Sequence, residues 1–139
     1  MTKEEIGYLI KIINDKMKSK IDADLKNYNL TFAQGRVLAF INKKGGQATQ
    51  KEIEIFLNVS HPTVVGIVSR LEQNGYAESF TDSSDKRNKI VKMTQSAKKM
   101  EAKIRRDIVE AENKMTYSLS DSEVKELRRM LMIVYTNLE

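Results

Sequence analysis

The sequence contains no cysteine and no tryptophan, and it has one proline and one histidine among 139 residues. The absence of cysteine excludes disulfides, thiol nucleophiles and zinc sites built on thiolates. A single histidine excludes a metal site built from several histidines of one chain, so we expect no metal and no cofactor. No apolar run approaches the roughly 18 residues of a membrane-spanning helix. We therefore expect a soluble cytoplasmic protein without a membrane partner.

The sequence also lacks the patterns that common enzymes use. It has no glycine-rich phosphate loop and no cluster of metal-binding side chains. Asp22 and Asp24 lie close together late in the first predicted helix, where we expect solvated carboxylates rather than an acid/base pair. We therefore expect that the chain is not an enzyme.

Positive charge is what the sequence has in excess, with a net charge of +5 and an isoelectric point near 9.3. This balance alone fits a nucleic acid, an anionic membrane surface or no special partner. Its placement says more, because Lys86 to Arg106 holds nine basic residues and one acid, Glu101. For Lys98 to Arg106, a solvated helix surface and electrostatic steering of DNA are both open interpretations.

The first half of the sequence predicts three helices. Apolar residues three and four positions apart indicate one long helix over Ile6–Leu25, which the segment N-Y-N-L ends. The segment T-F-A-Q is a capping box that starts a second helix after Thr31, and this helix stops at K-K-G-G. The segment T-Q-K-E is another capping box and starts a short third helix after Thr49.

Three further helices are predicted after the third. Ser60 is expected to cap a fourth helix that has Pro62 in its first turn and ends at Gly75. Thr94 is expected to cap a fifth helix that extends to about residue 117. The capping box S-D-S-E, which begins at Ser120, starts the sixth.

Two short strands lie between the fourth and fifth helices. The segments Y-A-E-S-F and K-I-V-K-M are joined by T-D-S-S-D-K-R-N, which is rich in turn formers and ends in basic residues. A short helix, a tight link and a capped helix form a helix-turn-helix, and a hairpin directly after it forms a wing. We predict a mainly α fold with a small β-hairpin wing, in which a winged helix-turn-helix is flanked by dimerisation helices.

This arrangement suits duplex DNA. A helix fits the major groove, where its first residues reach base edges and its terminal amides can bond a phosphate. A hairpin tip that carries Lys86, Arg87 and Lys89 can contact the neighbouring minor groove or backbone. The alternative is a winged-helix module for protein–protein contact, in which the basic wing is only solvated.

Three stretches resemble the MarR (multiple antibiotic resistance regulator) family of winged-helix repressors: L-T-F-A-Q-G-R-V-L-A-F-I, T-Q-K-E-I-E-I-F-L-N-V-S-H-P-T-V-V-G-I-V-S-R-L-E-Q-N-G-Y and D-K-R-N-K. The family's Asp-x-Arg-x-Lys wing signature is met by Asp85, Arg87 and Lys89. The resemblance covers Leu30 to Thr94. It implies a dimeric repressor that binds double-stranded DNA at a pseudo-palindromic operator and is often released by a small ligand. We keep a small aromatic or anionic effector as a further candidate partner.

The resemblance also implies roles for single residues. Arg87 corresponds to the wing arginine that enters the minor groove, and Asp85 would brace the wing through hydrogen bonds or a salt bridge. Position 66 is often larger and polar or basic in relatives, so Gly66 shifts the expected base reading to its neighbours. The predicted DNA-binding residues are Ser60, His61, Pro62, Thr63, Val65, Gly66, Arg70, Asp85, Lys86, Arg87 and Lys89.

The flanking helices carry apolar stripes that a segment as small as the winged helix cannot cover. An amphipathic helix buries its stripe against another element, and a two-fold dimer is the commonest way to do so. We therefore expect a homodimer with an N-terminal dimerisation helix over residues 1–29, a DNA-binding domain over 30–94 and C-terminal dimerisation helices over 95–139.

Some residues keep two interpretations at this stage. His61 can contact DNA or simply begin a helix, and Gly66 can allow close packing within the protein or a close approach to DNA. An apolar stripe of the fifth helix fits a core or dimer seam better than a ligand pocket; it consists of Met100, Ile104, Ile108 and Met115. Four tyrosines can line an effector pocket or be buried with bonded hydroxyls, namely Tyr8, Tyr28, Tyr117 and Tyr135.

Overall fold

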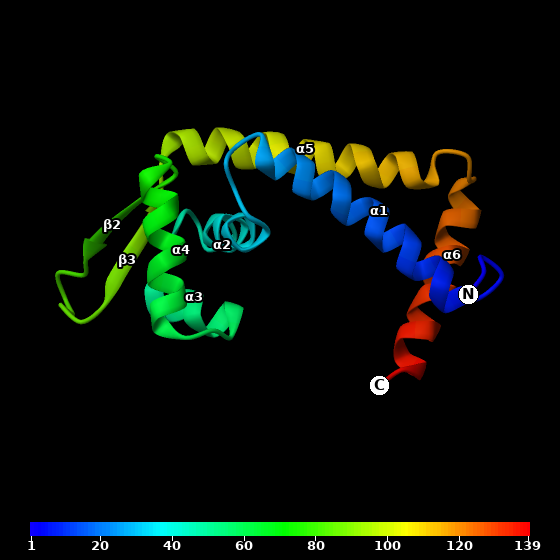
Figure 1. Cartoon of the computed structure of the whole chain (residues 1–139), viewed down its shortest axis with the longest axis horizontal. Helices are drawn as coiled ribbons and strands as arrows, with labels where there is room; N and C mark the ends of the chain where they lie inside the picture. The colour runs from blue at the N-terminus through cyan, green and yellow to red at the C-terminus, as the bar shows by residue number, and fades with distance from the viewer. The chain divides into compact units, whose positions relative to one another are not determined.

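Six α-helices and three short β-strands make up the protein, whose computed structural model describes residues 1–139 (Figure 1). The helices are α1 (Ile6–Lys26), α2 (Phe32–Lys43), α3 (Gln50–Leu57), α4 (His61–Gln73), α5 (Gln95–Thr116) and α6 (Asp121–Asn137). The strands are β1 (Gln47–Thr49), β2 (Ala77–Thr81) and β3 (Lys89–Met93). The predicted mainly α fold with a small β-hairpin wing is confirmed. None of the helices has the length and apolar content that crossing a membrane requires.

The chain divides into two compact units, Met1–Ile104 and Arg105–Glu139, and the boundary lies inside α5. The first unit contains α1 to α4, the sheet and the start of α5. The second contains the rest of α5 and all of α6. The boundary between these compact units differs from the domain boundaries expected near residues 30 and 94. Those expected domain boundaries stay a prediction.

The three predicted capping boxes are present. In each box the N-cap hydroxyl accepts from the backbone N–H three residues on, and that residue's side chain accepts from the N-cap N–H. The bond lengths lie between 2.9 and 3.2 Å. The pairs are Thr31–Gln34, Thr49–Glu52 and Ser120–Glu123. Thr94 caps α5 as predicted, since its Oγ1 accepts from the N–H of Ala97 at 3.2 Å.

The prediction for the cap of α4 is wrong in one respect. Ser60 occupies the N-cap position with an extended backbone, but its side chain makes no bond to the helix backbone. The Ser60 hydroxyl lies 2.9 Å from the hydroxyl of Thr63, which takes the place of the backbone donor. Pro62 lies in the first turn, where its missing N–H costs little.

Residues Asn58 to Ser60 form the tight link between α3 and α4. Asn58 ends α3 in the left-handed region with a φ of 54°, which an asparagine tolerates better than most residues. At the other end of α4, Gly75 has a φ of 77°, and the N–H of Tyr76 bonds the carbonyl of Leu71 at 2.9 Å. This C-terminal motif confirms that Gly75 stops α4, whose last helical residue is Gln73.

The wing belongs to a three-stranded antiparallel sheet with the order β1-β3-β2. The predicted hairpin is β2 and β3, paired from Ala77 opposite Met93 to Thr81 opposite Lys89. β1 was not predicted from the sequence; it pairs with β3 and places Ala48 opposite Val91. Both of these residues are buried, so β1 ties the base of the hairpin to the core.

The core of the first unit is aliphatic. Its fully buried side chains come from α2, α3, α4 and β3, and they are Val37, Leu38, Ile41, Ile53, Val64, Val68, Leu71 and Val91. Met100 of α5 belongs to this core and Ile104 packs against it, whereas Ile108 and Met115 are about half exposed. The apolar stripe of α5 is therefore core at its start and uncovered further along.

Two contacts fix α3 against α2. The rings of Phe40 and Phe56 stack with their centroids 4.3 Å apart. Lys44 Nζ lies 2.7 Å from Glu52 Oε2, and this hydrogen bond, followed by the bond from the Thr49 N–H, lowers the pKa of Glu52. The ionised Glu52 therefore stabilises the fold at pH values above the usual pKa of a glutamate. This stabilisation is lost as the pH falls through the lowered pKa of Glu52.

Candidate nucleic-acid interface

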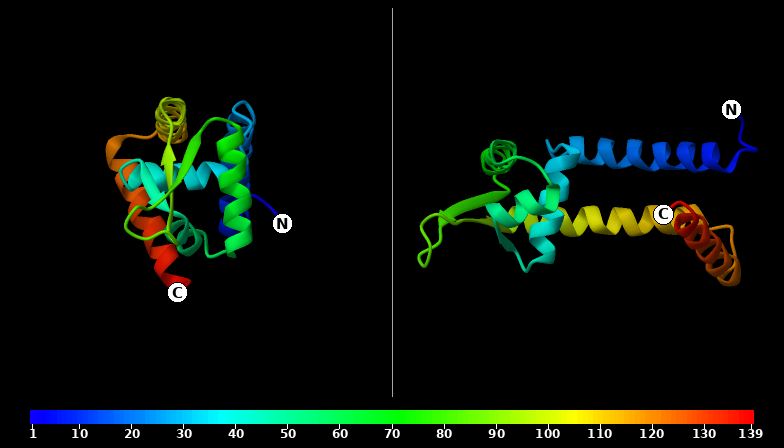
Figure 2. Two further views of the ribbon diagram at one scale, coloured as in Figure 1. Left: turned by 90° about the vertical axis from the view of Figure 1, so that its left-hand side faces the viewer. Right: turned by 90° about the horizontal axis from the view of Figure 1, so that it is seen from below.

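One face of α4 is buried and the opposite face is exposed. Val64, Val68 and Leu71, spaced four and three residues apart, lie in the core and fix the rotation of the helix about its axis. The predicted contact residues of this segment are all exposed, and they are Ser60, His61, Pro62, Thr63, Val65, Gly66 and Arg70. The β2–β3 hairpin lies beside α4 in the same unit (Figures 1 and 2).

Gly66 lies on the exposed face without a packing role. A Cβ atom added to Gly66 would meet no atom of the chain within 4 Å. Glycine in a helix interior costs about 1 kcal/mol of stability relative to alanine. Packing within the chain therefore does not explain this residue, and the close approach to DNA stays a prediction.

The tip of the wing is held by its own hydrogen bonds. Asp82 Oδ1 accepts from the backbone N–H of Ser84 at 3.0 Å and from the Ser84 hydroxyl at 2.8 Å. Both bonds lower the pKa of Asp82, and the bond from the backbone N–H has the larger effect. The N–H of Asp82 donates to the carbonyl of Asn88 at 2.9 Å. The tip is therefore a turn whose conformation is stabilised by hydrogen bonds within it.

Asp85 and Arg87 interact within this turn. Asp85 Oδ1 accepts from the backbone N–H of Arg87 at 3.1 Å and lies 3.5 Å from its Nε. The Arg87 side chain is 94% exposed. Asp85 therefore braces the wing as expected and leaves the guanidinium at the surface, with Lys86 and Lys89 exposed on either side.

A cleft of about 250 Å³ lies where α3, the start of α4 and the wing converge. It brings together three predicted residues, His61, Arg87 and Lys89, although His61 lies far from the other two in the sequence. It also contains four residues that the sequence analysis did not single out, namely Gln50, Lys51, Glu54 and Asn88. The helical spacing of Gln50, Lys51 and Glu54 places them on one face of α3, and this signal could have found them.

Inside the cleft, His61 Nδ1 lies 3.0 Å from Glu54 Oε2. The Glu54 side chain is only 16% exposed, while that of His61 is 62% exposed. The pair links α3 to α4 across the turn of the helix-turn-helix. His61 is therefore more than a helix-start residue.

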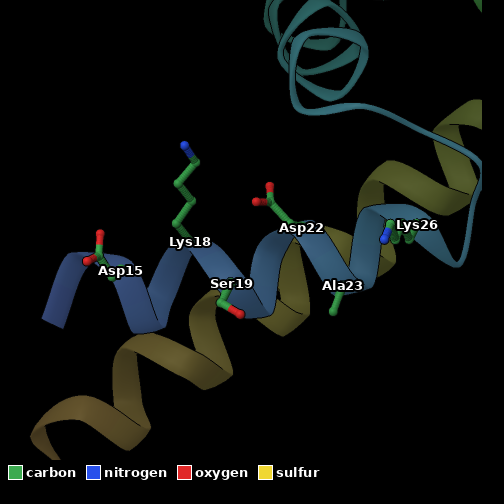
Figure 3. A pocket seen from close by; sticks show the side chains of 6 residues that line it. All are labelled: Asp15, Lys18, Ser19, Asp22, Ala23 and Lys26. Carbon is green, nitrogen blue, oxygen red and sulfur yellow. The ribbon is translucent and has the colours of Figure 1, made fainter. Parts of the chain in front are cut away.

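A larger hollow of about 510 Å³ runs along α1 (Figure 3). Its lining comes from α1 alone and consists of Asp15, Lys18, Ser19, Asp22, Ala23 and Lys26. It contains none of the four tyrosines that were considered for an effector pocket. Tyr28 instead lies beside the core, where its carbonyl accepts from the Tyr76 hydroxyl at 3.0 Å.

Comparison with known proteins agrees with this geometry. Residues 28–88 of the chain match the MarR family. YwoH of Bacillus subtilis (strain 168), an HTH-type transcriptional regulator, is 32% identical over 119 residues, which cover 84% of this chain and 85% of YwoH. The chain belongs to the MarR family.

Other similar proteins extend the match over nearly the whole chain. MepR of Staphylococcus aureus in complex with DNA has a TM-score of 0.81 and 27% identity, covering 96% of this chain and 99% of MepR. MepR bound to ethidium has a TM-score of 0.74 and 26% identity over 97% of both chains. The repressor IacR of Pseudomonas putida is 25% identical over 136 residues, 95% of this chain and 78% of IacR.

This MarR-family protein is a DNA-binding transcription regulator. The alternative of a winged-helix module for protein–protein contact finds no support in these similarities. The family and the relatives named above are transcription regulators and not enzymes.

Proposed function

We propose that the chain is a homodimeric repressor that binds a pseudo-palindromic operator. The observation that carries this proposal is the exposed face of α4, which stands beside a wing whose tip presents Arg87 at 94% exposure. Two such faces related by a two-fold axis would read two half-sites about 34–36 Å apart.

In the proposed complex α4 lies in the major groove. Its early residues reach base edges first, and Val65, which is 42% exposed, offers an apolar surface to a thymine methyl group. Arg87 enters the adjacent minor groove, while Lys86, Lys89 and Arg70 neutralise phosphates. Ser60, His61, Pro62, Thr63 and Gly66 supply the remaining contacts at the start of α4.

The dimer is supported by apolar surface that one chain leaves uncovered. α6 buries none of its residues, although its sequence is strongly amphipathic. α1 likewise exposes Ile6, Ile10 and Ile13. Residues 1–29 and 95–139 are the proposed dimerisation segments, and residues 30–94 the proposed DNA-binding domain.

A small molecule is proposed to release the operator. The description of IacR as a repressor supports repression, and MepR with bound ethidium supports an aromatic molecule as the effector class. Such a ligand weakens DNA binding only if it favours a different arrangement of the two DNA-binding domains.

Selection of duplexes from a random pool tests the proposed operator binding. We expect the recovered sequences to share an inverted repeat with half-sites one helical turn apart. The logarithm of the affinity should fall with the logarithm of salt by about 0.9 for each neutralised phosphate. A pool without any enriched repeat, together with a flat salt dependence in fluorescence anisotropy, would contradict the proposal.

Replacing Gly66 with alanine is expected to stabilise the protein and weaken operator binding. The free energy of unfolding should rise by up to about 1 kcal/mol, because the added methyl group meets no atom of the chain. Operator affinity should fall by about fivefold or more, since the methyl group separates α4 from the groove. Denaturant unfolding and anisotropy measure the two effects.

Gly7→Ala is the matched control for this substitution. Gly7 lies in the first turn of α1, and an added Cβ atom there also meets nothing within 4 Å. Because Gly7 belongs to a proposed dimerisation segment, sedimentation should first show that this variant is dimeric, and its operator affinity should then equal that of the wild type. Equal affinities of the Gly66→Ala and wild-type proteins would show that no close approach occurs at Gly66.

A further inference from the structure

The cleft between α3, α4 and the wing has a lining suited to an anion. Three of its residues are cations, Lys51 from α3 and Arg87 and Lys89 from the wing region. Its one carboxylate, Glu54, is bonded to His61. Gln50 and Asn88 add neutral amide groups. The charges that face the cleft therefore leave an excess of positive charge.

The contact between Glu54 and His61 fixes which ring nitrogen is free. A carboxylate only accepts hydrogen bonds, so at a separation of 3.0 Å the Nδ1 of His61 must be the donor. Nε2 is then the nitrogen that remains for a partner on the exposed side chain. Because Glu54 is mostly buried and Phe56 anchors α3 through its ring stack, this orientation is imposed by the scaffold.

We propose that this cleft seats one backbone phosphate of the DNA, that Glu54 is the positioning residue which holds His61 Nε2 toward that phosphate, and that DNA binding is accompanied by proton uptake at His61. The inference rests on the proposed operator binding and deepens it. It assigns Lys51 and Glu54 of α3 to the interface, together with the residues of α4 and the wing.

The proton uptake follows from hydrogen-bond chemistry. In the neutral ring Nδ1–H donates to Glu54, so Nε2 carries a lone pair, which cannot bond a phosphate oxygen because that oxygen is also an acceptor. When a proton from solvent adds to Nε2, the ring donates to Glu54 and to the phosphate at the same time. Histidine is the side chain whose charge changes most readily between pH 5 and 8.

The surrounding charges make this uptake depend on DNA. Lys51, Arg87 and Lys89 line the cleft beside His61, and the Glu54 carboxylate is bonded to its ring. Asp85 offsets part of the charge of Arg87 through their contact at 3.5 Å. A bound phosphate adds a negative charge and offsets that of the cations, so the protonated ring is favoured in the complex. Operator affinity should therefore rise as pH falls.

The first test measures operator affinity by anisotropy at pH 6 and pH 8 for the wild-type chain and three variants. The wild type should bind about fivefold more tightly at pH 6 than at pH 8, as expected when a hydrogen bond to an ionised group is gained. His61→Gln and Glu54→Gln should lose most of this difference. A role of Glu54 in folding alone would weaken binding equally at both pH values.

Glu52→Gln is the matched control. It removes a carboxylate from the same helix but outside the cleft, and a glutamine at this position preserves a capping box, as Gln34 does in α2. The control should keep the pH dependence of the wild type. If the wild type and His61→Gln show the same pH dependence, or if affinity rises with pH because Nε2 accepts from a base amino group, the proposal is overturned.

The second test needs no DNA. His61 is the only histidine, so the ¹⁵N spectrum of the free protein contains a single imidazole. At alkaline pH we expect the tautomer with the proton on Nδ1, and Glu54→Gln should shift the population toward the proton on Nε2. Proton on Nε2 in the wild type would refute the positioning role of Glu54. A protein that binds no duplex at any pH would instead refute operator binding, so the two failures are distinguishable.

Discussion

Arg87→Ala is expected to weaken operator binding more than tenfold while leaving the free energy of unfolding unchanged. The side chain is 94% exposed and its contacts lie within the wing turn, so its removal costs the fold little. Its loss removes a charge-assisted contact that the cationic tip is proposed to make in the minor groove. Anisotropy at constant salt and thermal unfolding measure the two quantities.

Arg87→Lys separates charge from shape at the same position. Lysine keeps the positive charge but lacks the planar fork of the guanidinium and its geometry against Asp85. We expect it to recover only part of the lost affinity. Lys86→Ala should instead reduce the slope of log affinity against log salt concentration by about one, as expected for the loss of one phosphate contact, with a smaller loss of affinity. If Arg87→Ala binds the operator as tightly as the wild type, the wing does not enter the minor groove.

The parts of the fold that depend on local sequence could be predicted. A capping box involves residues three positions apart, so Thr31, Thr49 and Ser120 marked the starts of their helices correctly. Gly75 marked the end of α4 for the same reason, since a left-handed backbone there favours glycine. The order of these signals, with the hairpin after α4, was sufficient to predict a winged helix-turn-helix.

The parts that depend on contacts between distant residues could not be predicted. β1 has only three residues and is defined by its pairing with β3, about 40 positions along the chain. Ser60 has the right residue type for a cap, but the competing hydroxyl of Thr63 is visible only in three dimensions. Helical spacing could have marked Glu54 as part of one face of α3, but its pairing with His61 could not be predicted, because the link at Asn58 must fold before the carboxylate meets the ring.

Leu131→Asp is expected to separate the proposed dimer and thereby to abolish tight operator binding. Leu131 lies at the centre of the apolar stripe of α6, which consists of Val124, Leu127, Leu131, Val134 and Leu138. It is 47% exposed in one chain, and α6 buries no residue. A partner that covers this stripe would have to bury an unpaired carboxylate, which costs several kcal/mol. The dimer dissociation constant should therefore rise by at least about 100-fold.

Ser122→Asp supplies the control for Leu131→Asp. It adds the same charge to the same helix on the opposite side, in the first turn, where the helix dipole favours an acid. Sedimentation should find this variant dimeric and Leu131→Asp monomeric at micromolar concentration. Circular dichroism should find the winged helix-turn-helix folded in both, because the core around Leu38 contains no residue of α6. A monomer holds only one half-site, so operator affinity should fall together with dimerisation. A Leu131→Asp protein that stays dimeric would place the dimer contact elsewhere than on this stripe.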